Sequence, residues 1–335
     1  MARTWLRRGA AVAAFAILGG GAWAVANRDT LQTRYAAHQL KNAATDEERA
    51  RWAESLAARD PQELFALAKQ SDEGIRTACV AAVAKQLETR PATDPAGSEL
   101  ALLVIEEIAG GNESFAPLLP VSVQRCGAVY GEKCRTAVRN GLKSAAPGVR
   151  IAAIRAAIHP SVGLRGDVMP LLAAAEPEVR RTAMLAIGPA SDSEVVVGDE
   201  ELFRWLHDAD ADVRVLCRAA LQSRGRSDSE IALGKRLVDP DAGERLKLLL
   251  DLRYDDELPD VEPWLERLSH DNDPGVRAGA ARVALELGAE RMRSVPAWVS
   301  RLAEADTDLT VRRIVRMHRG LGVTTDLEIR LVDGP

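Results

Sequence analysis

Hydrophobic and polar positions along this chain follow a helical period, and the pattern itself repeats. Alanine- and leucine-rich runs, each about one helix long, alternate with short acidic or Pro-Gly segments. In the clearest examples a turn is followed by a β-branched residue, an arginine and an alanine-rich run, which predicts a helix beginning just after the turn. These runs are DEGIRTACVAAVA (72–84), APGVRIAAIRAAI (146–158), EPEVRRTAMLAIG (176–188), DADVRVLCRAALQ (210–222) and DPGVRAGAARVALELG (273–288).

The arginines of these runs recur at a nearly constant interval. From Arg150 onward the successive spacings are 30, 34, 31, 32 and 35 residues. A period of this size is typical of arrays in which each repeat is a small helical unit stacked on the next. The aligned arginines are Arg76, Arg150, Arg180, Arg214, Arg245, Arg277 and Arg312.

Composition favours helices over a sheet-based fold. Apolar residues make up 47% of the 335 residues but aromatic residues only 4%, whereas a β-sandwich needs β-branched and aromatic residues in alternation. We therefore predict an all-α fold, an α-solenoid of stacked antiparallel helix pairs preceded by one N-terminal apolar helix. The expected segments are 1–26, an anchor or signal; 27–44, a juxtamembrane linker; 45–145, degenerate repeats; 146–320, regular repeats; and 321–335, a C-terminal cap.

The repeats resemble HEAT repeats, in the short form also found in bilin-lyase-like HEAT proteins. The family pattern places an aspartate in the turn between two helices and an arginine six residues later, early in the second helix. The resemblance covers about residues 45–320 and is most regular from 146 on, although Ser144 and Ala174 take the aspartate position before Arg150 and Arg180. The matching pairs are Asp208 and Arg214, Asp239 and Arg245, Asp271 and Arg277, and Asp306 and Arg312.

A structural role follows for these side chains. A turn aspartate accepts hydrogen bonds from the free N–H groups at the start of the second helix. Stacking of repeats would bring each arginine close to turn carboxylates of its own and neighbouring repeats, and a partly buried ladder of this kind sets the register between them. We expect the ladder to contain the four pairs above, with Arg76, Arg150 and Arg180 as its less regular members.

The N-terminus has the composition of a membrane-targeting segment. Three arginines precede Gly9–Ala26, which carries no charge over 18 residues. That length is close to the ~20 residues of a spanning helix, but small residues at Ala24 and Ala26 also fit a signal-peptide cleavage site. We favour an uncleaved anchor and keep a cleaved signal as the alternative. Since basic residues stay on the cytoplasmic side, the bulk of the chain is expected on the extracytoplasmic, periplasm-like side.

Charge argues against nucleic acid as a partner. The formal net charge is −5, and it becomes −8 without the arginines of the N-terminal segment. A surface this acidic does not attract a phosphate backbone.

The four cysteines fall into two groups. Cys79 and Cys217 each lie three residues after a repeat arginine, where other repeats have alanine, so we interpret them as small buried residues. Cys126 and Cys134 lie outside that position, eight residues apart, and could form a disulfide in an oxidising compartment or remain thiols. Their spacing matches no zinc-binding pattern.

The sequence offers no constellation of residues for catalysis. Asp208, Asp210 and Asp212 have the first spacings of a calcium loop, but neither its glycine nor its bidentate glutamate follows. His207 and His270 each precede an aspartate at equivalent turn positions, and no further histidine has ligand spacing. The chain contains no nucleophile elbow, phosphate-binding glycine loop or His-Glu-x-x-His motif. We predict no catalytic residue, cofactor or metal site.

The favoured function is that of a non-enzymatic protein–protein interaction scaffold. An array of paired helices curves, and its inner helices form a groove that suits a protein partner. With the N-terminal segment the chain would be a membrane-tethered adaptor on the extracytoplasmic side. The alternatives are a structural envelope component, and an enzyme or enzyme subunit of the HEAT-like lyase type.

Overall fold

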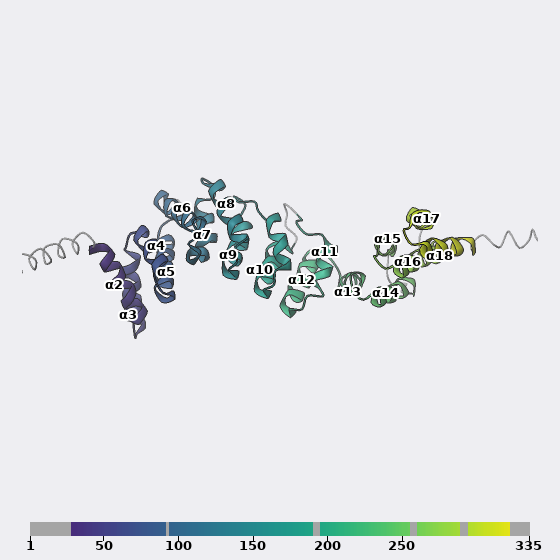
Figure 1. The fold of residues 1–335 in the computed structure, drawn as a ribbon, viewed down its shortest axis with the longest axis horizontal. Coiled ribbons are helices and arrows are strands. Elements are labelled where there is room, and N and C mark those ends of the chain that lie inside the picture. Colours follow the sequence, from purple (N-terminus) through teal and green to yellow (C-terminus); the bar gives the residue numbers. More distant parts are fainter. Residues whose placement is uncertain (1–27, 92–93, 190–194, 255–259, 289–293, 322–335) are drawn as a thin grey trace, which may run out of the picture. The chain divides into compact units, whose positions relative to one another are not determined.

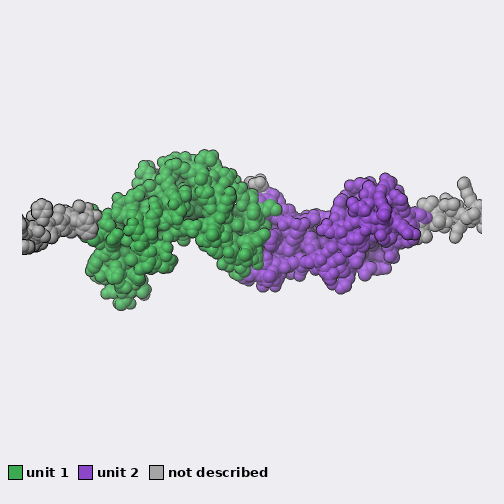
Figure 2. Space-filling view, in the orientation of Figure 1, with its two compact units in different colours: residues 1–187 green, residues 188–335 purple. Residues whose placement is uncertain are grey.

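The computed structural model describes residues 28–91, 94–189, 195–254, 260–288 and 294–321, and every regular element within them is a helix. Figure 1 shows these helices in chain order. The chain divides into two compact units, Met1–Ile187 and Gly188–Pro335, called unit 1 and unit 2 here and coloured separately in Figure 2. The all-α prediction is confirmed for the described residues.

Unit 1 contains the helices up to Ile187. Two of its elements, η1 and η2, are 3-10 helices, and each contains an internal proline, Pro117 or Pro170. The elements are α2 (Arg28–Asn42), α3 (Asp46–Ala57), α4 (Pro61–Gln70), α5 (Glu73–Thr89), α6 (Pro95–Ala109), η1 (Glu113–Leu118), α7 (Leu119–Cys126), α8 (Gly131–Leu142), α9 (Pro147–Ala157), η2 (Gly166–Ala173) and α10 (Pro177–Ile187).

Unit 2 consists of alternating shorter and longer helices in its described residues. Each described longer helix here carries one of the repeat arginines and follows a shorter helix, with a turn between them. The elements are α11 (Asp199–Trp205), α12 (Ala211–Ser223), α13 (Asp228–Leu237), α14 (Ala242–Tyr254), α15 (Glu262–Leu268), α16 (Pro274–Leu287), α17 (Ala297–Ala305) and α18 (Leu309–Leu321).

Helix starts follow from local side-chain chemistry. The N-cap side chains of Asp72, Asp210 and Asp273 each accept a hydrogen bond from a first-turn N–H group. Proline follows the N-cap in α4 and α16, where its missing N–H costs no helical hydrogen bond. These boundaries are therefore encoded within a few residues of each turn.

In unit 1, α5 and α9 occupy central places in the packing. Helix α5 contacts α2, α3, α4 and η1, while α9 contacts η1, α7, α8 and α10. Within residues 27–44, expected as a juxtamembrane linker, residues 28–42 form a helix whose Ala36 and Ala37 are buried. The stretch between α5 and α9, part of the segment 45–145 expected as degenerate repeats, folds as α6, η1, α7 and α8.

In unit 2, helices pack both on their neighbours in sequence and on the helix two further along the chain. Helix α16 contacts α14, α15, α17 and α18, and one continuous apolar core runs from Leu233 to Val315. Trp298 is buried in this core, and Trp264 is partly buried beside it. These two tryptophans of the short helices therefore contribute to the packing between helices.

Two predictions fall on residues that the structure does not describe. The apolar segment within residues 1–26 lies outside the described ranges, and so does the C-terminal cap expected at 321–335, apart from its first residue, which ends α18. Within the described residues, no helix combines the length and apolar character that crossing a bilayer requires.

Candidate interaction site

The turn before each arginine helix of unit 2 is built by two aspartates. At the turn between α15 and α16, Asp271 Oδ1 accepts the N–H of Asp273 at 2.8 Å, and Asp273 Oδ1 accepts the N–H of Val276 at 3.0 Å. The first carboxylate therefore tightens the turn and the second caps the helix. The same pair of bonds occurs at Asp208 and Asp210, and at Asp306 and Asp308. At Asp239 and Asp241 the first bond is the same, but Asp241 Oδ1 accepts the N–H of Gly243, two residues on.

Arg277 shows how the repeat arginine uses this turn. Its Nη1 donates to the main-chain carbonyls of Asp271 and Asn272 at 2.8 and 3.1 Å, which lie at the start of its own repeat. Its Nε and Nη2 donate to both carboxylate oxygens of Asp306, at 2.8 and 2.9 Å, in the turn of the next repeat. One planar guanidinium thus joins two successive turns.

Arg245 makes the same connection one repeat earlier. It donates to the Asp239 carbonyl at 2.5 Å and to the Asp271 carboxylate at 2.7 and 2.9 Å. Both forks are shielded, since the side chains of Asp271 and Asp306 are only 9% and 4% exposed. The hydrogen bond from Arg277 is the main reason why the pKa of Asp306 lies below its ordinary value.

Arg150 also joins two successive turns, with a glutamate in place of the aspartate. Arg150 Nη2 donates to the Glu176 carboxylate in the next turn at 2.6 Å, and its Nη1 donates to the Ser144 carbonyl in its own turn. Arg180 and Arg214 donate to the carbonyls of their own turns. Arg76 pairs instead with Glu73 on its own helix, at 2.8 Å.

Arg312 belongs to the last described turn of the array. Its main-chain N–H bonds to the Asp308 carbonyl, and its charge helps to lower the pKa of Asp306 after the larger effect of Arg277.

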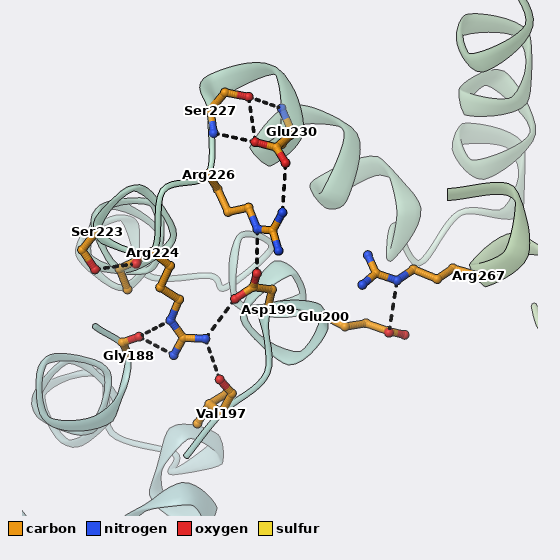
Figure 3. Close-up of polar contacts among 11 residues, drawn as sticks. Gly188, Val197, Asp199, Glu200, Ser223, Arg224, Arg226, Ser227, Glu230 and Arg267 are labelled. Carbon is orange, nitrogen blue, oxygen red and sulfur yellow. Dashed lines mark hydrogen bonds and ion pairs between the residues drawn. The ribbon is translucent and has the colours of Figure 1, made fainter. Parts of the chain in front are cut away.

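A second arginine network, which the sequence analysis missed, lies between α11, α12 and α13 (Figure 3). Arg224, 7% exposed, donates from Nε and Nη2 to the Gly188 carbonyl and from Nη1 to the Val197 carbonyl at 2.6 Å. Nη1 also meets Asp199 at 3.0 Å, and Arg226 binds the other oxygen of that carboxylate at 2.7 Å. These contacts hold the segment that leads into α11 against the C-terminal end of α12.

Electrostatics in this network favour the ionised carboxylates. Burial acts to raise the pKa of Asp199, but hydrogen bonds from Arg226 and Arg224 outweigh it and hold the pKa below its ordinary value. Arg226 extends the network to Glu230, which forms a capping box with Ser227 at the start of α13. The two arginines and the two carboxylates of this network therefore pair with one another.

A recess of about 610 Å³ lies beside this region, and its charges also largely pair with one another. Arg245 and Asp271 are joined by the fork described above, and Arg267 lies 3.8 Å from Glu200. Among the residues that the structure describes, no three potential metal ligands lie together. The recess is lined by Glu200, Arg204, Leu237, Val238, Asp239, Pro240, Arg245, Arg267, Leu268, His270, Asp271 and Asn272.

Exposed apolar side chains follow a clear rule in unit 2. Large exposed apolar residues in its described helices all lie in α12, α14 or α18, helices that carry a repeat arginine. The shorter helices α11, α13, α15 and α17 bury theirs, apart from partly covered tryptophans. The exposed residues are Val215, Leu246, Leu250, Tyr254, Leu309 and Met317.

All four cysteines are buried thiols in the structure. Cys79 and Cys217 lie apart from the other two, in α5 and α12, and Cys217 Sγ donates to the Leu202 carbonyl at 2.9 Å. Cys126 and Cys134 lie together, with their sulfurs 3.6 Å apart.

In comparisons with known proteins, no family model and no curated protein matches this chain.

Proposed function

We propose that the protein is a non-enzymatic interaction scaffold, a HEAT-like α-solenoid whose partner protein docks on the arginine helices of unit 2. The observation that carries the proposal is the segregation of exposed apolar residues to these helices. The forks of Arg245 and Arg277 join successive turns, so the arginine helices are held in register as a continuous support.

The centre of the proposed surface is one face of α14. Leu246, Leu250 and Tyr254 follow one another at intervals of four residues and are 40%, 54% and 68% exposed. Residues at this spacing lie on the same side of a helix. We call these three residues the α14 strip.

Charged side chains border the α14 strip. Glu286 of α16 pairs with Arg253 at 2.9 Å and with Arg282 at 2.8 Å. The Arg253 guanidinium also lies 4.9 Å from the centre of the Tyr254 ring, which supports that ring while leaving it exposed. An apolar centre with a charged rim is the usual anatomy of a protein interface.

The N-terminal segment supports a proposal for the cellular location of this surface. With residues 1–26 as an anchor, the array is tethered to a membrane and its partner is an extracytoplasmic protein. A cleaved signal would release the same surface into the same compartment.

A crosslinking experiment tests the scaffold proposal. The full chain carries a C-terminal tag in its native host, and proteins crosslinked to it in intact cells are identified by mass spectrometry. We expect one stoichiometric extracytoplasmic partner. Leu250→Glu should reduce its capture at least tenfold, because a charge in the apolar centre of an interface must be desolvated without a partner.

Val129→Glu is the matched control. Val129 is 72% exposed but lies between α7 and α8 in unit 1 and does not belong to the α14 strip, so capture should remain at the wild-type level. Equal capture by wild type and Leu250→Glu would exclude the α14 strip, and absence of any reproducible partner would contradict the scaffold itself.

A further inference from the structure

The closest pair of nucleophilic side chains described above, Cys126 and Cys134, plays no part in the proposed docking surface. Cys126 is the last residue of α7 and Cys134 lies in the first turn of α8. Both side chains are fully buried, and their sulfurs lie 3.6 Å apart in hydrogen-bonding contact. Only the short connection 127–130 separates the two helices.

We propose that Cys126 and Cys134 form a reversible dithiol–disulfide site that exchanges with an external disulfide and, when oxidised, joins α7 to α8. Formation of the bond requires the sulfurs to approach to ~2.0 Å, a movement that side-chain rotation can supply. The backbone between them is already folded back, since the N–H groups of Val129 and Tyr130 both bond to the Cys126 carbonyl, at 3.1 and 2.8 Å.

The surroundings give the two sulfurs different roles. The hydrogen bond from Cys126, and then the positive charge of Arg135, lower the pKa of Cys134 against the effect of burial. The same hydrogen bond and burial raise the pKa of Cys126. Cys134 also lies in the first turn of α8, next to Arg135, where the positive end of the helix and the guanidinium favour a thiolate. We therefore assign Cys134 as the sulfur that attacks and Cys126 as the resolving thiol.

The exchange proceeds in two balanced steps. The Cys134 thiolate attacks one sulfur of a disulfide R–S–S–R, forms a mixed disulfide and releases RS⁻. Cys126 then loses its proton and attacks Cys134 Sγ, which breaks the mixed disulfide and releases the second RS⁻. The protein loses two protons and two electrons, and the disulfide donor is reduced to two thiols.

Access to the pair lies on the side of the connection. Gly127 to Lys133, with Arg135 and Ser161, line a recess of about 430 Å³ next to the buried sulfurs. Gly127 packs closely on Ser161, and a methyl group there would overlap its hydroxyl. Exchange in the folded protein therefore requires the connection to move away from Ser161, which makes the reaction slower than that of an exposed thiol.

The other cysteines provide internal controls. Burial raises the pKa of Cys79 and of Cys217 to about 12, and each lies in a different helix from the pair and from the other. Neither has a neighbouring thiol at bonding distance, so neither should form a disulfide.

The test uses the full chain, reduced and then equilibrated with oxidised glutathione. Free thiols are alkylated after denaturation, and the cysteines are assigned by peptide mass spectrometry. We expect a linked peptide containing Cys126 and Cys134, two alkylated residues at Cys79 and Cys217, and full reversal by dithiothreitol. The oxidised protein should melt a few degrees higher than the reduced protein, because the crosslink restricts the unfolded chain.

Single variants test the assigned roles. In Cys126→Ala we expect a glutathione adduct to accumulate on Cys134, whereas in Cys134→Ala the remaining Cys126 should react at least tenfold more slowly. Circular dichroism establishes that both variants are folded. Failure of the wild-type bond to form, or bonding to Cys79 or Cys217, overturns the site; faster reaction at Cys126 overturns the assignment of the nucleophile.

Discussion

At the scale of single residues, Arg224 and Gly234 have roles that depend on distant parts of the chain. Arg224 satisfies the carbonyls of Gly188 and Val197, about 36 and 27 residues earlier, together with Asp199. Gly234 in α13 lies directly against the ring of Phe203 in α11, a ring that is 1% exposed. Neither contact belongs to the repeating pattern of the sequence.

Replacing Arg224 should destabilise unit 2 substantially. Arg224→Met leaves buried carbonyls and the Asp199 carboxylate without their donor, and we expect a loss of about 3 kcal/mol. Arg224→Lys should recover less than half of it, because one ammonium cannot reproduce the planar fork. Urea unfolding measures both, with Arg218→Lys on the exposed face of α12 as control. Full rescue by lysine would show that charge alone matters here.

Gly234→Ala should destabilise the protein although alanine favours helices. The added methyl group overlaps ring carbons of Phe203, and overpacking of this kind costs about 1–3 kcal/mol, more than the gain in helix propensity of under ~1 kcal/mol. Gly148→Ala in α9 is the matched control, since no heavy atom lies within 4 Å of its added carbon, and it should stabilise slightly. Thermal melts should move in opposite directions for the two variants.

At the scale of elements, the turns of unit 2 connect one helix pair to the next. Asp306 accepts from Arg277 of the preceding repeat and from the N–H of Asp308 in its own turn. The carboxylate thus takes part in both the turn and the contact between α16 and the turn before α18. A substitution at Asp306 should therefore disturb both this turn and the contact between successive repeats.

Asp306→Asn should lower stability by about 2 kcal/mol at neutral pH, because the shielded charge-assisted fork is lost. The pKa of Asp306 is lowered in the folded state, so its contribution is present above the ordinary value of 3.8 and disappears as pH falls through the lower folded value. The difference between wild type and Asp306→Asn should therefore shrink in acid, as measured by urea unfolding from pH 7 to pH 2. A constant difference across this range would exclude the charge as its origin.

At the scale of the whole molecule, we propose that the N-terminal segment sets where the protein works, as a tether to a membrane. Residues 28–42 are packed into unit 1 as α2, so a tether formed by residues 1–26 would connect almost directly to the folded helices. This arrangement would hold the array close to the membrane surface.

Deleting residues 2–26 should release the protein from membranes. We expect the full chain to remain in the membrane pellet after alkaline carbonate extraction, and the shortened chain, made without export, to be soluble and helical. Protease added from the extracytoplasmic side should digest the full chain in intact spheroplasts. Release of the full chain by carbonate would instead favour a cleaved signal, and protection from protease would reverse the proposed orientation.

The sequence by itself determined the helices, their turns and the period of the repeat arginines, because these depend on interactions within a few residues. Asp273 caps α16 using a carboxylate only three residues from the N–H that it accepts, and Pro274 follows it. The HEAT resemblance also identified Asp271 and Asp306 as turn residues, but it did not identify the second aspartate of each turn as the helix cap.

Only the tertiary structure decided which carboxylate each arginine meets. Arg245 reaches Asp271 across 26 residues, whereas Arg76, at the same position of its own run, pairs within its helix. The network of Arg224 and the approach of Cys126 to Cys134 likewise depend on how helices pack. The sequence predicted that the arginines would lie near turn carboxylates and that Cys126 and Cys134 could form a bond. The partners actually made depend on distances between helices, which the local pattern of one repeat does not set.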